Sequence, residues 1–122
     1  MRNGVIKIQL SVACLLILTA CTTNYVTPIA EIADPNHEEI ASIRTHTYNT
    51  YMVMYNPDTC KAIGDACGFF RSHAYAHYRL NHTLMRPKYY PPLSEKQADC
   101  YVAKYGKPNE IKAVVTLLLD EK

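Results

Sequence analysis

Residues 69–82 read FFRSHAYAHYRLNH, and the expected architecture can be built outward from this stretch. Apolar residues recur along it with a loose helical spacing, which predicts a helix over residues 66–83. Because residues four apart lie one above the other on a helix, His73 and His77 would share one face. Two imidazoles placed one turn apart can bind the same tetrahedral metal ion, so this helix is a candidate half of a metal site.

A second helix is predicted to supply the remaining ligands. Ser94 and Gln97 have the Ser-x-x-Gln spacing of a capping box, so the helix should begin at Ser94 and end before Gly106. Glu95 and Asp99 lie four apart and would share one of its faces. One carboxylate can ligate a metal ion while the other accepts a hydrogen bond from a ligand histidine.

Smaller elements are predicted around these two helices. Residues 45–55 are rich in Thr, Tyr, Val and Met, which suits one strand or two very short ones. Asn36 can cap a short helix over residues 38–43, and a third helix is expected from Pro108. The core-facing side of that third helix would consist of Ile111, Val114, Val115 and Leu118. The expected fold class is therefore α+β and mainly helical, with two metal-site helices, a C-terminal helix and a short strand or hairpin before them.

Together the two helical segments resemble the metal-binding part of small gluzincin-type zinc metallopeptidases. Those enzymes have His-Glu-x-x-His on one helix and Glu-x-x-x-Asp on a second; here residues 73–77 read HAYAH and residues 95–99 read EKQAD. The similarity covers roughly residues 57–105. It implies Zn(2+) ligands at His73, His77 and Glu95, with Asp99 as the partner of a ligand histidine.

The sequence departs from that family at the residue that performs the chemistry. Where such peptidases have the glutamate after the first histidine, this chain has Ala74. That glutamate takes a proton from the attacking water and delivers it to the leaving amine, a general-base contribution of about 10²–10⁴-fold. Tyr75 and Tyr78 point to other faces of the helix. His82 lies five residues past His77, where a three-histidine site of the metzincin type needs six. The resemblance therefore implies a zinc site without its catalytic base.

Two other interpretations of the same residues stay open. Zinc alone can polarise a substrate, which describes a residual peptidase in which glutamate restored at Ala74 would raise turnover. Alternatively, the histidine pair and the acidic pair are incidental, and the chain is a metal-free structural lipoprotein of the envelope. Chelators would then leave its stability unchanged, whether or not His73 and His77 are present.

The chain has ten tyrosines and no tryptophan, and several tyrosines flank the predicted site. Residues 48–55 are the candidate for an edge strand that aligns an extended peptide by main-chain pairing, as in peptidases of this type. The tyrosines that would line such a groove are Tyr48, Tyr51, Tyr55, Tyr89 and Tyr90. The competing interpretation is that they cover a small core and keep their hydroxyl groups in water.

The N-terminus predicts export and lipidation. Arg2 and Lys7 precede an apolar run over residues 8–18, which is long enough for a signal peptide and too short to cross a bilayer. The run ends in Leu18-Thr19-Ala20-Cys21, which resembles the lipobox of bacterial lipoproteins. Residues 1–20 would be removed, and lipid on Cys21 would anchor the chain to a membrane. The alternative is an ordinary secretory signal that ends in a cysteine by chance.

Cleavage before Cys21 changes the charge balance. Without Arg2 and Lys7, 11 basic residues face 11 acidic ones and the net charge falls from +2 to zero. We expect no nucleic-acid partner, because there is no basic stripe and the compartment is wrong. Residues 21–44 are expected to form the acylated cysteine and a tether, and residues 45–122 a single metallopeptidase-like domain.

Three further cysteines would lie in an oxidising compartment. A disulfide between Cys60 and Cys100 is favoured because it would tie one helix to another. A bond between Cys60 and Cys67 requires only that residues 60–65 form a turn. The sequence therefore favours the first pairing and leaves the second open.

The combined prediction is a lipoprotein of the cell envelope with a degenerate metallopeptidase-like domain, which binds zinc, a peptide, or both without hydrolysis. Its expected partners are membrane lipid through Cys21 and an extended peptide or an envelope protein. Thr22 follows Cys21 in place of the aspartate that retains lipoproteins in the inner membrane of enteric bacteria. An outer-membrane location is therefore favoured in an organism with two membranes.

Overall fold

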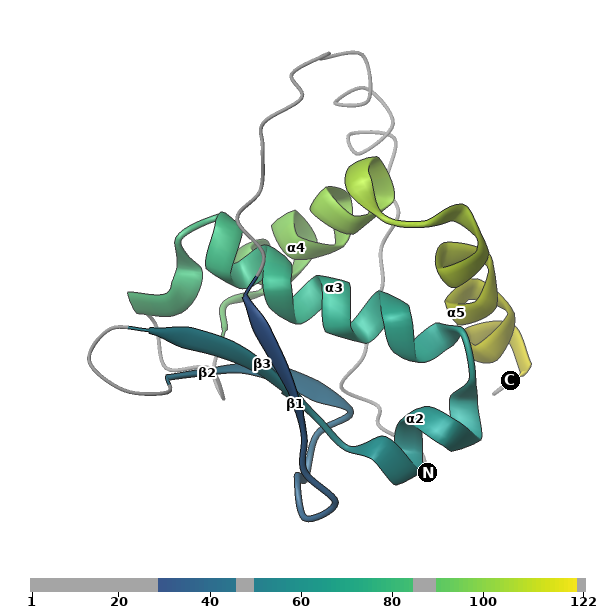
Figure 1. Ribbon diagram of the computed structural model, residues 1–122. Coiled ribbons are helices and arrows are strands. Elements are labelled where there is room, and N and C mark those ends of the chain that lie inside the picture. Colours follow the sequence, from purple (N-terminus) through teal and green to yellow (C-terminus); the bar gives the residue numbers. More distant parts are fainter. Residues whose placement is uncertain (1–28, 46–49, 85–89, 121–122) are drawn as a thin grey trace.

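The computed structural model describes residues 29–45, 50–84 and 90–120, and it confirms an α+β fold that is mainly helical (Figure 1). The elements are β1 (Ala30–Ala33), β2 (Ala41–Thr45), β3 (Tyr51–Tyr55), α2 (Pro57–Ile63), α3 (Ala66–Arg79), the 3₁₀ helix η1 (His82–Leu84), α4 (Pro92–Tyr105) and α5 (Pro108–Asp120). Helix α3 contacts the sheet, α4 and α5, so it is the centre of the fold. The predicted signal peptide, lipobox and lipidation site at Cys21 lie outside the described residues.

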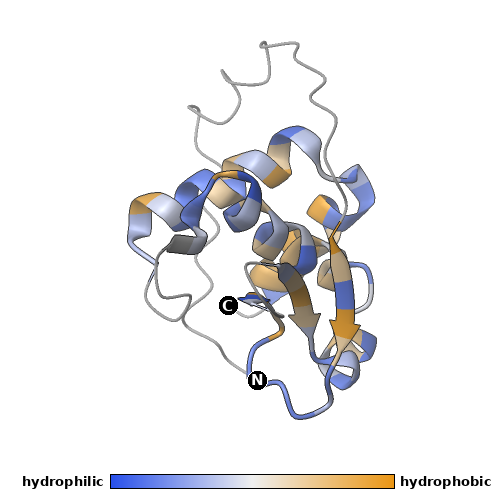
Figure 2. Cartoon of the chain, turned by 60° about the vertical axis from the view of Figure 1, so that its left-hand side comes forward, coloured by the Kyte–Doolittle hydropathy of each residue, from blue (hydrophilic) through white to orange (hydrophobic). Residues whose placement is uncertain are grey.

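The sheet has β3 in the middle, in the order β1-β3-β2. β1 runs parallel to β3 and pairs Ala30 with Met52, whereas β2 runs antiparallel to β3 and pairs Ile43 with Val53. Ile43 and Val53 are buried against Ala74 of α3. Figure 2 shows that the strands carry mostly hydrophobic residues, while the helices alternate between hydrophobic and hydrophilic ones. Packing of one sheet face on α3 therefore fixes the register of the hairpin.

Three expectations about this region are corrected. The folded domain begins before residue 45, because β1 and β2 lie within the expected tether of residues 21–44. Residues 38–43 form a bend and the start of β2 instead of a short helix, since Ile43 gains more by packing in the sheet than a single helical turn would provide. Residues 48–55 do not supply an edge strand, because β3 is paired on both sides and the edges of the described sheet are β1 and β2.

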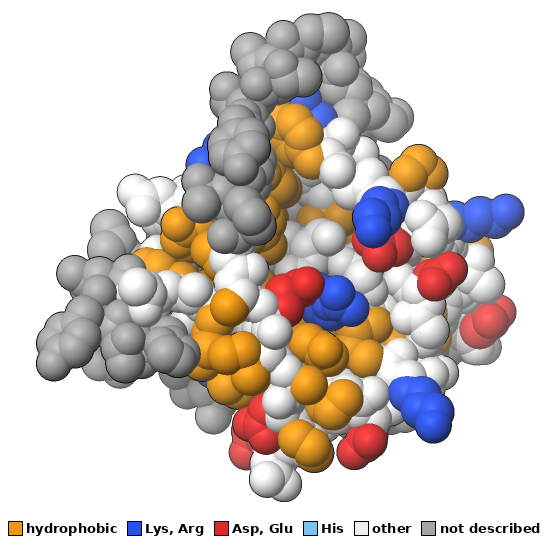
Figure 3. Space-filling view, viewed as in Figure 1, with side chains coloured by type: hydrophobic (Ala, Val, Ile, Leu, Met, Phe, Trp, Pro, Cys, Tyr) orange, Lys and Arg blue, Asp and Glu red, His pale blue; other side chains and the backbone are white. Residues whose placement is uncertain are grey.

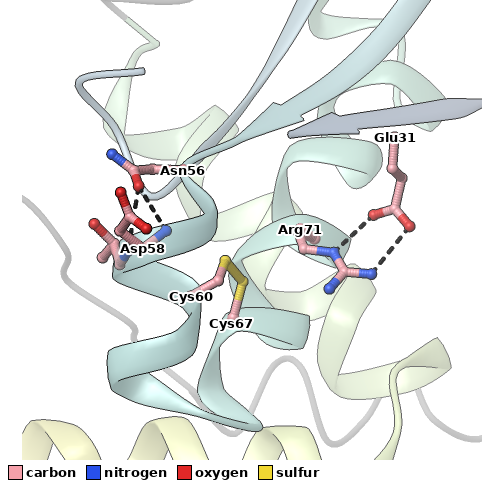
Figure 4. The surroundings of a disulfide bond; sticks show 7 residues. Glu31, Asn56, Asp58, Cys60, Cys67 and Arg71 are labelled. Carbon is pink, nitrogen blue, oxygen red and sulfur yellow. Dashed lines mark hydrogen bonds and ion pairs between the residues drawn. A yellow bond between two sulfur atoms is a disulfide. The ribbon is translucent and has the colours of Figure 1, made fainter. Parts of the chain in front are cut away.

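Helix α2 has both of its ends defined by single residues. Asn56 Oδ1 accepts hydrogen bonds from the backbone N–H groups of Asp58 and Thr59, at 2.9 and 3.2 Å, and so caps the start of the helix (Figure 4). Gly64 ends it with a φ of 62°, in the left-handed region that glycine adopts without strain. The turn at Gly64 lets α3 begin only two residues later.

Cys60 forms a disulfide with Cys67, so the favoured pairing of Cys60 with Cys100 is wrong. The turn between α2 and α3 brings the Cα atoms of Cys60 and Cys67 to 5.0 Å, which is within the range that a disulfide requires. Figure 4 shows the bond joining the two helices. Nearby, Arg71 donates two hydrogen bonds to the Glu31 carboxylate, at 2.9 and 3.1 Å, and ties α3 to β1.

The main core lies where α3 packs against α4 and α5. Phe69 is fully buried and meets Phe70 edge to face, with ring centroids 5.8 Å apart. Small residues on facing helices, Ala76 and Ala98, are both fully buried and allow a close approach. The buried members of this core are Ile40, Ala66, Phe69, Phe70, Ala76, Ala98, Val102 and Val114.

Helix α4 begins two residues earlier than predicted. Pro92 lies in its first turn, where a missing N–H has no effect, and Pro91 is the N-cap. The N-cap makes no side-chain hydrogen bond, so Ser94 and Gln97 do not form the predicted capping box. The helix ends at Gly106, as predicted.

Helix α5 begins at Pro108 and packs Ile111 and Val114 against the core, as predicted, but the rest of the predicted face differs. Val114 is fully buried, whereas Val115 is 36% exposed and Leu117 packs against the core instead. Figure 3 shows hydrophobic side chains scattered over one face of the molecule, around acidic and basic groups. Within the described ranges, no helix combines the length and the hydropathy needed to cross a bilayer.

Candidate metal centre

The structure brings the three predicted ligands together between α3 and α4. His73 and His77 lie on successive turns of α3, and Glu95 lies in the first turn of α4. Glu95 Oε1 is 2.7 Å from His77 Nε2 and 3.4 Å from His73 Nε2, and the two Nε2 atoms are 3.2 Å apart. One ligand atom from each residue lies within 4.8 Å of the others, so this group, called the trio below, could hold a metal ion.

The trio is buried on one side and open on the other. The His77 side chain is 4% exposed and that of His73 is 19% exposed, but the Glu95 side chain is 41% exposed. An ion can therefore reach the trio from the Glu95 side.

Asp99 holds His73 from behind. His73 Nδ1 donates a hydrogen bond of 2.8 Å to Asp99 Oδ1, and Asp99 is 1% exposed. Asp99 lies one turn after Glu95 on α4, so the Glu-x-x-x-Asp spacing places one carboxylate in the trio and the other behind it. This bond orients the His73 ring so that its Nε2 atom faces the other two residues of the trio. The second carboxylate oxygen, Asp99 Oδ2, is buried and has no hydrogen-bond partner among the described residues.

His82 holds His77 from behind, and sequence reasoning misses this contact. His82 is 6% exposed, its Nδ1 is 2.9 Å from His77 Nδ1, and its Nε2 is 2.9 Å from Gln97 Oε1. Asn81 has a φ of 64°, a left-handed conformation that asparagine tolerates, and this reverses the chain so that η1 folds back on α3. The available signal was Asn81, which tolerates a left-handed conformation, near the end of the helix predicted over residues 66–83; the observed helix ends at Arg79. The five-residue spacing excludes His82 as a metal ligand but not as a hydrogen-bond partner.

Tyr90 covers the remaining face of His77. The two rings are stacked, with centroids 3.7 Å apart and planes at 4°. Tyr51 and Tyr90 both pack against the buried cluster of β2, β3 and α3, which favours the interpretation that these tyrosines cover a core. Tyr48 and Tyr89 lie outside the described residues.

Charges at the site are strongly coupled. Burial alone would lower the pKa of His73, but hydrogen bonds to Asp99 and Glu95 outweigh it and raise that pKa to about 9. Burial alone would raise the pKa of Glu95, but hydrogen bonds with His73 and His77 lower it to about 2. Burial lowers the pKa of His77, and neighbouring His73 lowers it further. Burial, and then the Glu95 charge, raise the pKa of Tyr90 to about 12. Glu95 is therefore ionised, and the cation it attracts can be a proton on His73 or a metal ion.

Ala74 lies apart from the trio, in the apolar contact between α3 and the sheet. It is 2% exposed and packs in one cluster with Ile43 and Val53. A methyl group neither accepts nor donates a proton. At the position where metallopeptidases have their general base, this chain therefore has a core residue that packs α3 against β2 and β3.

Comparisons with known proteins add nothing to these residues: no protein family, curated protein or solved structure matches the chain. The resemblance to gluzincin-type peptidases therefore rests on the two motifs and on the arrangement of the trio with Asp99.

Proposed function

We propose that this chain is a membrane-anchored lipoprotein whose folded domain holds a zinc ion at His73, His77 and Glu95 and acts by binding rather than by hydrolysis. Support for the anchor comes from Leu18-Thr19-Ala20-Cys21 at the end of the signal-like segment. Lipid on Cys21 would attach the domain to the cell envelope, with the outer membrane as the favoured location where there are two membranes.

The observation that supports the metal most strongly is the direction in which the two imidazoles are held. His73 Nδ1 faces Asp99 at 2.8 Å and His77 Nδ1 faces His82 at 2.9 Å, so both rings turn Nε2 toward Glu95. A neutral imidazole with its hydrogen on Nδ1 has a lone pair on Nε2. A metal ion can therefore take the place of the hydrogens that join the two Nε2 atoms to Glu95 in the metal-free site, while Asp99 and His82 accept the Nδ1 hydrogens.

Zinc fits this donor set better than the other common divalent ions. Two imidazole nitrogens and one carboxylate oxygen are the protein ligands of many zinc sites, whereas calcium and magnesium prefer oxygen alone. The outer hydrogen bonds to Asp99 and His82 are the kind of support that metal-ligating histidines usually have. Bound zinc would neutralise the trio and add free energy of folding to a small domain.

The absence of catalysis follows from Ala74. Glu95 faces both imidazoles and is committed to the trio, so it is not free to act as a general base. A residual peptidase that relies on zinc alone remains the alternative, but the packing of Ala74 against Ile43 and Val53 counts against it. A metal-free structural lipoprotein of the envelope is the second alternative.

An extended peptide, or a strand of an envelope protein, is the partner that this proposal favours. β2 forms an edge of the described sheet and packs against α3, the helix that carries two of the trio. Extended segments bind such edges by main-chain hydrogen bonds. β2 therefore replaces residues 48–55 as the candidate strand for this role.

Metal content is the experiment that tests the proposal. The full chain is purified without a metal-binding tag, and zinc per chain is measured by mass spectrometry. We expect about one zinc per chain, lost when His73→Ala and His77→Ala are combined. His37→Ala is the matched control, because His37 is also a buried histidine, at 8% exposure, but bonds Ser42 instead of the trio.

The outcomes separate the hypotheses. Zinc in the wild-type and His37→Ala proteins, and none in the double variant, would support the site. If the folded wild-type protein takes up no zinc even after incubation with the ion, the metal proposal is wrong and the metal-free envelope lipoprotein is the better account.

A further inference from the structure

A chain of three side chains leads from the trio to the surface: His77, His82 and Gln97. We propose that His82 and Gln97 are positioning residues that hold the His77 ring with Nε2 directed at the trio and accept its Nδ1 hydrogen when Nε2 binds an ion. The resemblance to metallopeptidases assigns neither residue a role. The consequence for metal affinity rests on the proposed function, but the hydrogen-bond chain itself does not.

The geometry of the chain is that of two well-formed hydrogen bonds. His77 Nδ1 and His82 Nδ1 are 2.9 Å apart, and His82 Nε2 and Gln97 Oε1 are also 2.9 Å apart. His77 and His82 are 3% and 6% exposed, so neither ring can exchange these bonds for water without moving. The residues come from three elements, α3, η1 and α4, and the left-handed Asn81 makes the arrangement possible.

The direction of the bonds follows from the outer end of the chain. An amide oxygen only accepts, so His82 Nε2 must donate to Gln97 Oε1. Once Nε2 of His77 binds an ion, the hydrogen of that ring lies on Nδ1, so His77 Nδ1 donates to His82 Nδ1. With no ion, His77 Nε2 lies 2.7 Å from the Glu95 carboxylate and donates to it instead. The ion-binding form of a buried histidine is thus supported by a residue of α4 that it does not touch.

The two histidines of the trio are held by different means. His73 donates to a buried carboxylate, Asp99, which is an acceptor whatever its surroundings. His77 contacts the ring of His82, whose other nitrogen contacts Gln97, and Gln97 is exposed. His77 is therefore the ligand whose presentation can be altered from the surface without changing any residue of the trio.

Two substitutions at each position test this. His82→Asn places an amide oxygen near the Nδ1 position and retains an acceptor, whereas His82→Leu removes it. Gln97→Glu supplies an obligate acceptor, whereas Gln97→Leu supplies none. His37→Asn is the control for the loss of a buried histidine elsewhere. Gln97 is exposed, so its variants keep the test valid if His82→Leu fails to fold.

The first measurement uses the metal-free full chain labelled with ¹⁵N. Nuclear magnetic resonance should detect the ¹⁵N–¹⁵N coupling across the bond between His77 Nδ1 and His82 Nδ1. Gln97→Glu should retain this coupling and Gln97→Leu should weaken it. No coupling in the wild-type protein, or an unchanged coupling in Gln97→Leu, would overturn the inference whether or not zinc binds.

The second measurement is zinc affinity by competition with a chelator. Loss of a residue that supports a metal ligand typically weakens binding about 10–100-fold, which is the loss expected for His82→Leu. Gln97→Leu should lose less, and His82→Asn, Gln97→Glu and His37→Asn should stay close to the wild type. Equal affinity in the wild-type and His82→Leu proteins would overturn the inference. If no protein binds zinc, the proposed function fails, and the coupling measurement still decides whether His82 positions His77.

Discussion

The two halves of α3 bury their inner faces by different chemistry. In the first half, residues 66–70 are all buried, and their contacts are mainly apolar side chains and the disulfide to α2, with the Glu110 carboxylate against Gly68. In the second half, His73 and His77 face Glu95, Asp99 and His82. One helix thus carries an ordinary core at one end and a polar, titratable cluster at the other.

The difference shows which part of the domain has a stability that depends on pH and on metal ions. Burial of apolar surface is favourable in any buffer that folds the protein. Burial of imidazoles and carboxylates is unfavourable unless their charges are balanced and their hydrogen bonds are satisfied. The second half of α3 is therefore stable only with a cation, either a proton on His73 or a metal ion in the trio.

The largest expected effect comes from the apolar half. Phe69→Ala should lower the free energy of unfolding by about 3–5 kcal/mol, because Phe69 is fully buried and a cavity would remain. The loss should be the same with zinc and with a chelator, as measured by denaturant unfolding. His77→Ala should behave differently, since zinc would no longer stabilise the protein. If Phe69→Ala abolished the response to zinc, the two halves of α3 would be coupled and the comparison would be wrong.

The polar half should show a pH dependence that the apolar half lacks. In the metal-free protein, the pKa of His73 is raised to about 9 by its hydrogen bonds to Asp99 and Glu95, despite burial. A raised pKa stabilises the fold fully below the ordinary value near 6.5, and this stability is lost as pH rises toward 9. The loss should be on the order of 3 kcal/mol. The lowered pKa of His77 acts in the opposite direction and removes stability as pH falls below 6.5.

Thermal unfolding of the metal-free protein between pH 6.5 and 9 checks this prediction. His73→Gln should remove the slope, and zinc should reverse it, because zinc replaces the proton that is lost. The same slope in His73→Gln as in the wild type would show that the titrating group lies elsewhere.

The same contrast explains how much could be read from the sequence. Helix geometry predicts the His73–His77 and Glu95–Asp99 pairs, because a spacing of four residues places two side chains on one face whatever the rest of the fold. The helix ends near Gly106 and Pro108 were predictable for the same reason, since capping and stop signals are local. Local sequence rules therefore predicted the two pairs of site residues and most of the helices. The assignment of Glu95 to the trio and of Asp99 to the outer position came from the resemblance to gluzincin-type peptidases.

Features that depend on distant contacts were not predictable. The Cys60–Cys67 bond depends on how sharply α2 turns into α3, and the sequence left two pairings open. β1 pairs with β3 through residues 22 positions apart, such as Ala30 and Met52, with no local signal at Ala30. His82 reaches His77 only because Asn81 reverses the chain, and its acceptor Gln97 comes from another helix. Each of these outcomes is decided by tertiary packing rather than by local propensity.

The smallest effect concerns Ala74, where the two kinds of surface meet. Its methyl group is buried against Ile43 and Val53, yet it follows a residue of the trio directly. Ala74→Glu should lower the free energy of unfolding by about 1–3 kcal/mol, because the longer side chain has to displace the sheet from α3. Ala74→Gln has nearly the same shape without the charge, so the difference between the two variants isolates the effect of burying a carboxylate.

Activity is the second measurement on Ala74→Glu. With zinc supplied, we expect no hydrolysis of a mixed peptide library, because a glutamate directed into the contact with β2 and β3 cannot reach a substrate at the trio. Hydrolysis by Ala74→Glu but not by Ala74→Gln, at wild-type stability, would mean that the catalytic geometry is intact apart from the base. The chain would then be a peptidase that lost one residue, and the apolar packing of Ala74 would be a consequence of that loss rather than its cause.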